Sequence, residues 1–255
     1  MQSPKARHVS LASISGKGIW LTVWPGDNVN VGAVVALARS AGLHTLWVRT
    51  GGTTDGFYGG RLLRELVPAA HAAGLSVVAW DFPTLSNPSA DAKRAAMAFA
   101  AGADAFSPDI EAAAEGTYLS ARRVRYYLSL VRRVAGNRPV VATVPAPDSY
   151  WLGFYPYAAE SPFVDAFAPM VYWACNEPGS ATREAVEYLA RFRPVVPIGQ
   201  DFNMGPIGGP PGLPTPLEIW SFVDVAHRLG AIGASLYDLE SGGSTQLAAL
   251  TAYPW

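Results

Sequence analysis

The chain has 255 residues, a length typical of one (β/α)8 barrel and long for a single core of average size. Half of its residues are hydrophobic and 15% are charged, against a usual charged fraction of about 25%, which argues against a largely disordered chain. The net charge of −1 excludes the strong positive field that attracts nucleic acid or anionic membranes, so we expect no nucleic-acid partner.

The sequence contains no apolar run near the roughly 18 residues that span a bilayer, so we expect no membrane insertion. Its single cysteine, Cys175, excludes an internal disulfide. Residues 1–15 lack the apolar core of a signal peptide. The protein is therefore cytosolic, or the chain begins after a removed leader or upstream domain. We favour the second interpretation and expect a secreted or cell-surface protein.

Short strand patterns alternate with helical patterns along the whole chain. Strands are predicted at 19–24, 45–50, 76–82, 105–111, 140–144, 166–173, 195–201 and 234–240. Helices are predicted at 29–41, 60–73, 89–101, 118–135, 182–192 and 216–229, with shorter ones near 150–159 and 245–251. Several helices end in Ala-Gly or Leu-Gly, where glycine provides the left-handed C-terminal cap.

Repeated strand-then-helix units require parallel strands joined by right-handed crossovers. Eight such units favour a closed barrel over an open sheet, so the predicted fold is α/β, a single (β/α)8 TIM barrel with outer helices. We expect residues 1–16 to form an N-terminal tail and residues 17–255 to form the barrel. The Gly/Pro-rich run 204–216 is predicted to be a long loop after the seventh strand, where it shapes a substrate subsite.

The fourth predicted strand ends with two carboxylates, Asp109 and Glu111, two positions apart. Because side chains two apart on a strand share a face, the small and acidic residues from Ala105 to Glu111 are predicted to face the barrel axis. Phe106 and Ile110 then face the outer helices. The last residues of a barrel strand reach the mouth, where enzymes of this fold carry out their chemistry. The carboxylate pair is therefore the first candidate for a catalytic site.

Other predicted strand ends carry aromatic, amide and charged side chains. These are Trp20, Trp24, Arg49, Trp80, Asp81, Tyr172, Trp173, Gln200, Asp201, Asp238 and Glu240. No histidine or lysine falls at a strand end, which argues against a metal site and a Schiff-base aldolase, and we expect no cofactor. Carboxylates and aromatic rings fit a site that cleaves sugars, because acids donate protons and stabilise an oxocarbenium ion while rings stack on pyranoses.

Two segments resemble the motifs of a known family. Residues 104–111, DAFSPDIE, resemble the strand-four signature of chitinase-type glycosidases, in which an acidic residue opens a run that ends in D-x-E. Residues 164–173, VDAFAPMVYW, are similar to the M-x-Y element of that family through Met170 and Tyr172. The D-x-E segment with Glu115-Gly116 and the later P-x-x-Y-W also resembles a group of bacterial glycosidase-like barrels. The likeness covers roughly residues 102–173, with a looser one over 233–241.

This resemblance implies a TIM-barrel glycoside hydrolase acting on a carbohydrate substrate. It implies that Glu111 is the proton donor, Asp109 its electrostatic partner and Tyr172 a contact to the substrate or an intermediate. The chain departs from the chitinase pattern at two positions. Ser107 occupies the place of the middle acid, and Trp173 replaces the acid that follows the tyrosine.

Several assignments have alternatives. Asp109 and Glu111 either raise each other's pKa by like-charge repulsion or form a structural pair with backbone amides or Arg49. Trp20, Trp24, Trp80 and Trp173 are either core residues or sugar platforms, Trp47 is expected to face a helix, and Arg49 holds either an acid or the substrate. If Asp109 only tunes Glu111, the second catalytic carboxylate is Asp201, Asp238 or Glu240.

Two other classes of protein remain as alternatives. One is a catalytically degenerate barrel that serves as a glycan-binding module. The other is a phosphosugar enzyme that binds phosphate at residues 241–244, Ser-Gly-Gly-Ser, after the eighth strand.

Overall fold

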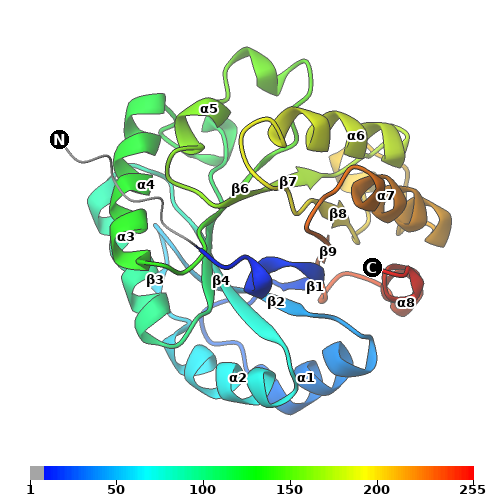
Figure 1. Ribbon diagram of the computed structural model, residues 1–255, viewed down its shortest axis with the longest axis horizontal. Coiled ribbons are helices and arrows are strands. Elements are labelled where there is room, and N and C mark those ends of the chain that lie inside the picture. Colours follow the sequence, from blue (N-terminus) through cyan, green and yellow to red (C-terminus); the bar gives the residue numbers. More distant parts are fainter. Residues whose placement is uncertain (1–8) are drawn as a thin grey trace.

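A computed structural model describes residues 9–255 and confirms the predicted (β/α)8 barrel, with helices arranged in a ring around the strands (Figure 1). The parallel strands are β1 (Gly16–Leu21), β2 (Thr45–Gly52), β4 (Ser76–Phe82), β5 (Ala105–Pro108), β6 (Val141–Pro145), β7 (Ala166–Val171), β8 (Ile198–Gln200) and β9 (Gly233–Tyr237). A two-residue strand that the sequence did not predict, β3 (Gly56–Phe57), pairs antiparallel with the end of β2.

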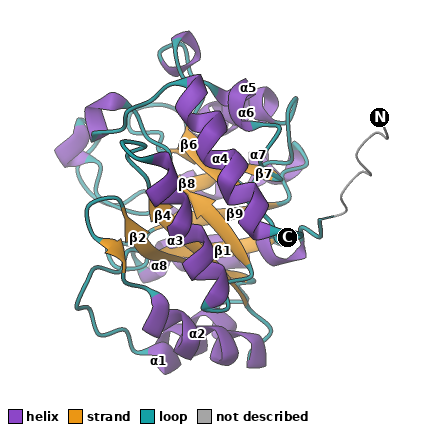
Figure 2. Ribbon diagram, turned by 90° about the vertical axis from the view of Figure 1, so that its left-hand side faces the viewer, coloured by secondary structure: helices purple, strands orange, loops and turns teal. Residues whose placement is uncertain are grey.

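Helices pack outside the strands, and in the side view α3 and α4 cross in front of them (Figure 2). The helices are α1 (Val31–Ser40), α2 (Gly60–Ala72), α3 (Pro88–Ala100), α4 (Ala121–Ala135), α5 (Tyr157–Glu160), α6 (Pro178–Leu189), α7 (Pro216–Arg228) and α8 (Ser244–Ala252). Short 3-10 turns are η1 (Ala12–Ile14), η2 (Ala113–Glu115), η3 (Trp151–Gly153) and η4 (Gly205–Ile207). Within residues 9–255, no helix is long and apolar enough to cross a membrane.

The barrel closes at a seam between β5 and β6. The other strands follow the order β5-β4-β2-β1-β9-β8-β7-β6 through regular parallel ladders. Two isolated parallel bridges cross the seam, Phe106 with Val140 and Asp109 with Thr143. The Ser107 hydroxyl donates to the Val141 carbonyl at 2.9 Å and lies 2.8 Å from Thr143 Oγ1. Ser107, where the chitinase-type pattern has an acid, therefore joins the two strands just below the mouth.

Large side chains fill the inside of the barrel. The rings of Trp20 and Trp47 stack there with centroids 4.8 Å apart, next to Val78 and Ala105. The prediction that Trp47 faces a helix is wrong. Gly18 explains the difference, because a Cβ at this position would lie 2.8 Å from Trp47 Nε1, so only glycine leaves space for the indole.

The lower end of the barrel is closed by the segment before β1. Ile14 of η1 is fully buried in the same inner cluster, although it belongs to the segment predicted as a tail. Residues 1–8 of that predicted tail lie outside the described residues.

Side-chain caps fix where several helices begin after the loops at the mouth. Asn30, Asn87, Ser120, Glu177 and Thr215 each accept a hydrogen bond from a backbone amide in the first turn of the following helix. The loop predicted at 204–216 is irregular apart from η4 and ends at the Thr215 cap. The caps therefore define the lengths of the strand-to-helix loops that surround the mouth.

Candidate active site

The end of β5 places the carboxylate pair at the mouth of the barrel. Ala105 lies in the inner cluster while Phe106 and Ile110 lie in the outer one, which confirms the predicted alternation. Asp109 is 8% exposed, and its Oδ1 has no hydrogen-bond partner within residues 9–255. Glu111 is partly buried, and no hydrogen bond within the same residues reaches its carboxyl group. Both groups therefore remain available to a bound molecule.

The surroundings of the pair favour protonation. Burial raises the pKa of Glu111 to about 7, and the negative charge of Glu115 adds to this effect. Burial also raises the pKa of Asp109 well above its ordinary value; the charge of Glu111 raises it further, while Arg49 opposes the shift. The raised pKa values of both groups favour a protonated carboxyl group at this strand end. Glu115 of η2 is an electrostatic partner that the sequence did not identify.

An aromatic wall stands beside the pair. Tyr172, just after β7, meets the ring of Phe202 edge-on at 5.1 Å between centroids and the ring of Tyr237 at 6.0 Å. The ring centroid of Tyr237 also lies 6.3 Å from that of Trp80. Burial raises the pKa of Tyr172 well above its ordinary value, and the charges of neighbouring groups add to this, so its hydroxyl stays protonated. Phe202 was not predicted, although it directly follows a strand end.

Arg49 occupies another part of the mouth. Its guanidinium carbon lies 3.6 Å from the centre of the Trp24 ring and 5.5 Å from that of Trp80. Its Nη2 is 3.5 Å from Asp55 Oδ2, whereas its Nε is buried and has no hydrogen-bond partner within residues 9–255. Of the four tryptophans considered as sugar platforms, Trp24 presents its ring to solvent, with 51% of the residue exposed, whereas Trp20, Trp80 and Trp173 are buried.

Other predicted contacts do not reach the mouth. Trp20 and Trp173 are each 1% exposed, Trp20 inside the barrel and Trp173 on its outer face, packed 5.8 Å from Phe222. Neither offers a free ring face to a sugar. Trp173 packs in the outer cluster, whereas Tyr172 packs against the inner cluster, so the two rings lie on opposite sides of the sheet.

Asp81 is likewise displaced from the predicted site. It is fully buried on the outer face of β4, while its neighbour Trp80 lies inside the barrel. Arg94 of α3 binds both of its carboxylate oxygens, with Nε 2.6 Å from Oδ2 and Nη2 2.9 Å from Oδ1. Asp81 therefore joins β4 to α3 and is buried away from the open mouth.

The three candidates for a second catalytic carboxylate all accept hydrogen bonds from the fold. Asp201 is 1% exposed and accepts from the Gly243 amide at 3.3 Å. Asp238 accepts from the Thr22 hydroxyl at 2.7 Å, and Glu240 accepts from the Thr22 amide at 3.0 Å. Burial raises the pKa of Asp201 to about 7 and raises that of Glu240. These acids connect the ends of β8 and β9 to neighbouring segments and are less free than the pair on β5.

The same turn weakens the phosphosugar alternative. The Ser241 amide donates to Asp238 Oδ1 at 3.0 Å, the Gly242 amide to the Asp238 carbonyl at 2.9 Å, and the Gly243 amide to Asp201. These amides are already used by oxygens of the protein. Gln200 is similarly occupied, since it is 3% exposed and accepts from the Ala174 amide at 3.1 Å.

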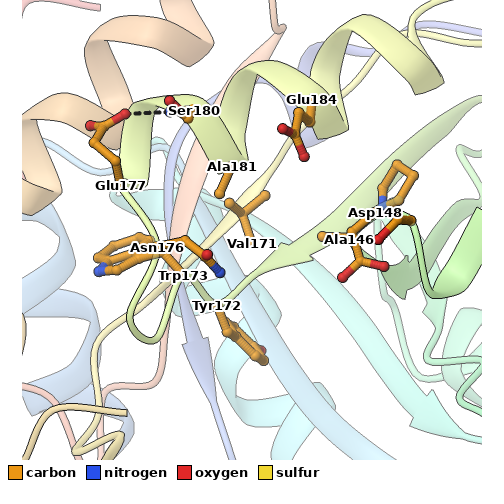
Figure 3. Close-up of a pocket in the computed structure, with 12 residues that line it drawn as sticks. Ala146, Asp148, Val171, Tyr172, Trp173, Asn176, Glu177, Ser180, Ala181 and Glu184 are labelled. Atoms are coloured by element: carbon orange, nitrogen blue, oxygen red, sulfur yellow. Dashed lines mark hydrogen bonds between the residues drawn. The ribbon is translucent and has the colours of Figure 1, made fainter.

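A cavity of 470 Å³ opens beside Tyr172, outside the barrel axis (Figure 3). Glu184 projects toward it from α6 and Asp148 from the loop after β6. Glu177 caps α6, and the amides of Gly179 and Ser180 with the Ser221 hydroxyl lower its pKa to about 2. The sequence did not predict this cavity, because its acids lie in a loop and a helix. Within residues 9–255, no three histidine, cysteine or acidic side chains are grouped to hold a metal ion.

Comparison with known proteins shows that this chain is similar to several solved structures in its fold. Neither a protein-family model nor a curated protein sequence matches the chain. A chitinase from Chromobacterium violaceum superposes with a TM-score of 0.71 at 11% identity, covering 94% of this chain and all of the other. The Bacillus cereus spore cortex-lytic enzyme SleL superposes with a TM-score of 0.68 at 12% identity, covering 92% of this chain and 73% of the other. A GH113 beta-1,4-mannanase superposes with a TM-score of 0.66 at 11% identity, covering 94% of this chain and 98% of the other. The chain thus shares its barrel architecture with these enzymes.

The ion pair between Asp81 and Arg94 gives a testable consequence. Arg94→Met leaves the buried charge of Asp81 uncompensated and also removes the 3.0 Å ion pair of Arg94 with the buried Asp91, and we expect it to lower the free energy of unfolding by roughly 3–5 kcal/mol in urea denaturation. Arg61→Met is the control, because Arg61 is 75% exposed and lies 3.9 Å from Glu65, and its cost should stay below about 0.5 kcal/mol. Equal costs for the two variants would contradict the structural role of Asp81.

Proposed function

We propose that this protein is a glycoside hydrolase that cleaves a poly- or oligosaccharide by general acid catalysis at the mouth of the barrel, with Glu111 as the acid. The observation that carries the proposal is the Glu111 carboxyl group. It stands at a barrel strand end, accepts no hydrogen bond from the residues that the structure describes, and has a pKa raised to about 7. The named activities of the structural neighbours, a chitinase and a mannanase among them, support a carbohydrate substrate.

Glu111 donates its proton to the oxygen of the scissile glycosidic bond. An ordinary glutamate with a pKa near 4.3 is almost fully ionised at neutral pH, whereas a group with a pKa of about 7 is protonated in about half of the molecules. As Glu111 ionises, its charge holds a proton more firmly on Asp109. The pair then carries about one negative charge, which stabilises the oxocarbenium-like transition state without repulsion between two carboxylates.

The aromatic residues bind and orient the sugar. The exposed ring of Trp24 offers an apolar face for stacking, and Arg49 beside it supplies a fixed positive charge. The protonated Tyr172 hydroxyl donates a hydrogen bond to the substrate or an intermediate. Asp109 is the best candidate for the second carboxylate in the molecules where it is ionised and Glu111 holds the proton. Within residues 9–255 its Oδ1 lacks a partner, while Asp201, Asp238 and Glu240 accept bonds from the fold.

The first test measures new reducing ends released from chitin, peptidoglycan, mannan, and α- and β-glucans by the wild type and by Glu111→Gln. We expect the wild type to cleave one class and the variant to lose about 10²–10⁴-fold of that activity, because glutamine cannot donate the proton. Glu65→Gln, an exposed change on α2, should retain full activity. An equally active Glu111→Gln variant would contradict the proposal. Binding of one glycan by wild type and variant without cleavage would favour the glycan-binding module.

The second test concerns pH. The charge of Glu115 raises the pKa of Glu111, so Glu115→Gln lowers it. Since the protonated form of Glu111 is the active one, kcat/KM should fall as pH rises through about 7 in the wild type and at a lower pH in the variant. The pH profile of Glu65→Gln should match that of the wild type. An unchanged alkaline limb in Glu115→Gln would show that Glu111 does not control it.

A further inference from the structure

A second buried acid lies behind the carboxylate pair. Glu160, in α5, is fully buried, and its Oε1 lies 3.0 Å from the Tyr155 hydroxyl oxygen. The same hydroxyl lies 2.7 Å from the carbonyl oxygen of Ile110, the residue between Asp109 and Glu111. Glu160 is thus connected to the backbone of the candidate site through one side chain. The sequence analysis assigned no role to Glu160 or Tyr155.

Counting protons leaves two possible assignments for these bonds. A tyrosine hydroxyl has one proton to donate, and a backbone carbonyl can only accept. If Tyr155 donates to Ile110 O at the shorter distance, its second bond requires Glu160 to donate, so Glu160 must be protonated. The alternative, donation by Tyr155 to an ionised Glu160, leaves the Ile110 carbonyl without this donor.

The surroundings of Glu160 also favour its neutral form. Its Oε2 is buried without a hydrogen-bond partner, and no salt bridge within residues 9–255 reaches it. An ionised carboxylate here would leave a charged oxygen unsatisfied, which is costly in a protein interior. The titratable groups that act on Tyr155 and Tyr157 include Glu111, Asp148 and Tyr188 besides Glu160, and none of them is a cation. Burial raises the pKa of Glu160 to about 8, in agreement with the geometry.

We propose that Glu160, in its protonated form, is a positioning residue that acts through Tyr155 to fix the Ile110 carbonyl and thereby the carboxyl groups of Asp109 and Glu111. This inference rests on the proposed function of Glu111. The site needs such a support because β5 ends at Pro108 and joins β6 through isolated bridges. Within residues 9–255, three hydrogen bonds hold the backbone of Asp109 and Ile110: the Asp109 amide with Asp81 O at 2.8 Å, the Ile110 amide with Thr143 O at 3.1 Å, and the Tyr155 hydroxyl with Ile110 O at 2.7 Å.

The test compares kcat and KM of four variants on the glycan that the wild type cleaves, with activity expressed per folded molecule. Glu160→Gln keeps a neutral donor toward Tyr155, so its kcat should stay within about twofold of the wild type. Glu160→Leu and Tyr155→Phe remove the connection, and we expect kcat to fall by about 10–100-fold with little change in KM, since small misplacements of catalytic groups are costly. Tyr157→Phe is the control, because that hydroxyl bonds to the Pro145 carbonyl at 3.0 Å and leaves Ile110 untouched.

The outcomes separate a positioning role from a structural one. A lower melting temperature with unchanged kcat in Tyr155→Phe and Glu160→Leu would overturn the inference. A loss of kcat in Glu160→Gln as large as that in Glu160→Leu would overturn the neutral-donor assignment. If Glu160→Leu does not fold, Tyr155→Phe carries the same comparison.

An infrared measurement keeps the inference testable if the wild type cleaves no glycan. The difference spectrum between the wild type and Glu160→Gln at pH 7 should contain the carbonyl stretch of a protonated carboxyl group. Absence of this band would show an ionised Glu160 and overturn the inference whatever the activity. Presence of the band in a protein without glycosidase activity would support the protonated Glu160 while contradicting the proposed function.

Discussion

The site depends on keeping two carboxyl groups at the end of one strand in an environment with little water. Asp109 and Glu111 project to the same side of β5, and burial is the main cause of the raised pKa of each. Low solvation makes a carboxyl group an effective acid at neutral pH, but it also makes the pair costly to hold ionised. The positive charge of Arg49 opposes the upward shift of the Asp109 pKa and so moderates this cost.

The weakest seam of the barrel lies directly beneath this pair. Between β5 and β6 the ladder is reduced to isolated bridges, and the Ser107 hydroxyl supplies bonds to the neighbouring strand. Ser107, at the position where the chitinase-type pattern has an acid, thus helps to close the barrel in this chain. On the outer side, Tyr155 contacts the backbone between the two acids. The geometry of the site therefore depends on hydrogen bonds from several loops, in addition to the strand itself.

Periodicity in the sequence predicted the fold and the carboxylate pair, because alternation along a strand and the strand-helix repeat are local properties. The same rule of alternation, applied to adjacent residues, excludes Asp81 beside Trp80 and Trp173 beside Tyr172 from a common face. Contacts between distant segments were not predictable: Gly18 admits the Trp47 ring, Glu115 shifts the pKa of Glu111, and Glu160 lies behind Ile110. Such contacts arise from packing between loops, for which a single sequence has no periodic signal.

The most direct measurement is the pKa of Glu111 in the folded wild-type protein, followed by carbon-13 NMR of the glutamate carboxyl groups and assigned with Glu111→Gln. The account predicts a midpoint of about 7 for the signal that the variant lacks. A midpoint near the ordinary glutamate value of about 4.3 would mean that Glu111 is ionised at neutral pH. It would then be no general acid, and the proposed chemistry of the site would be wrong.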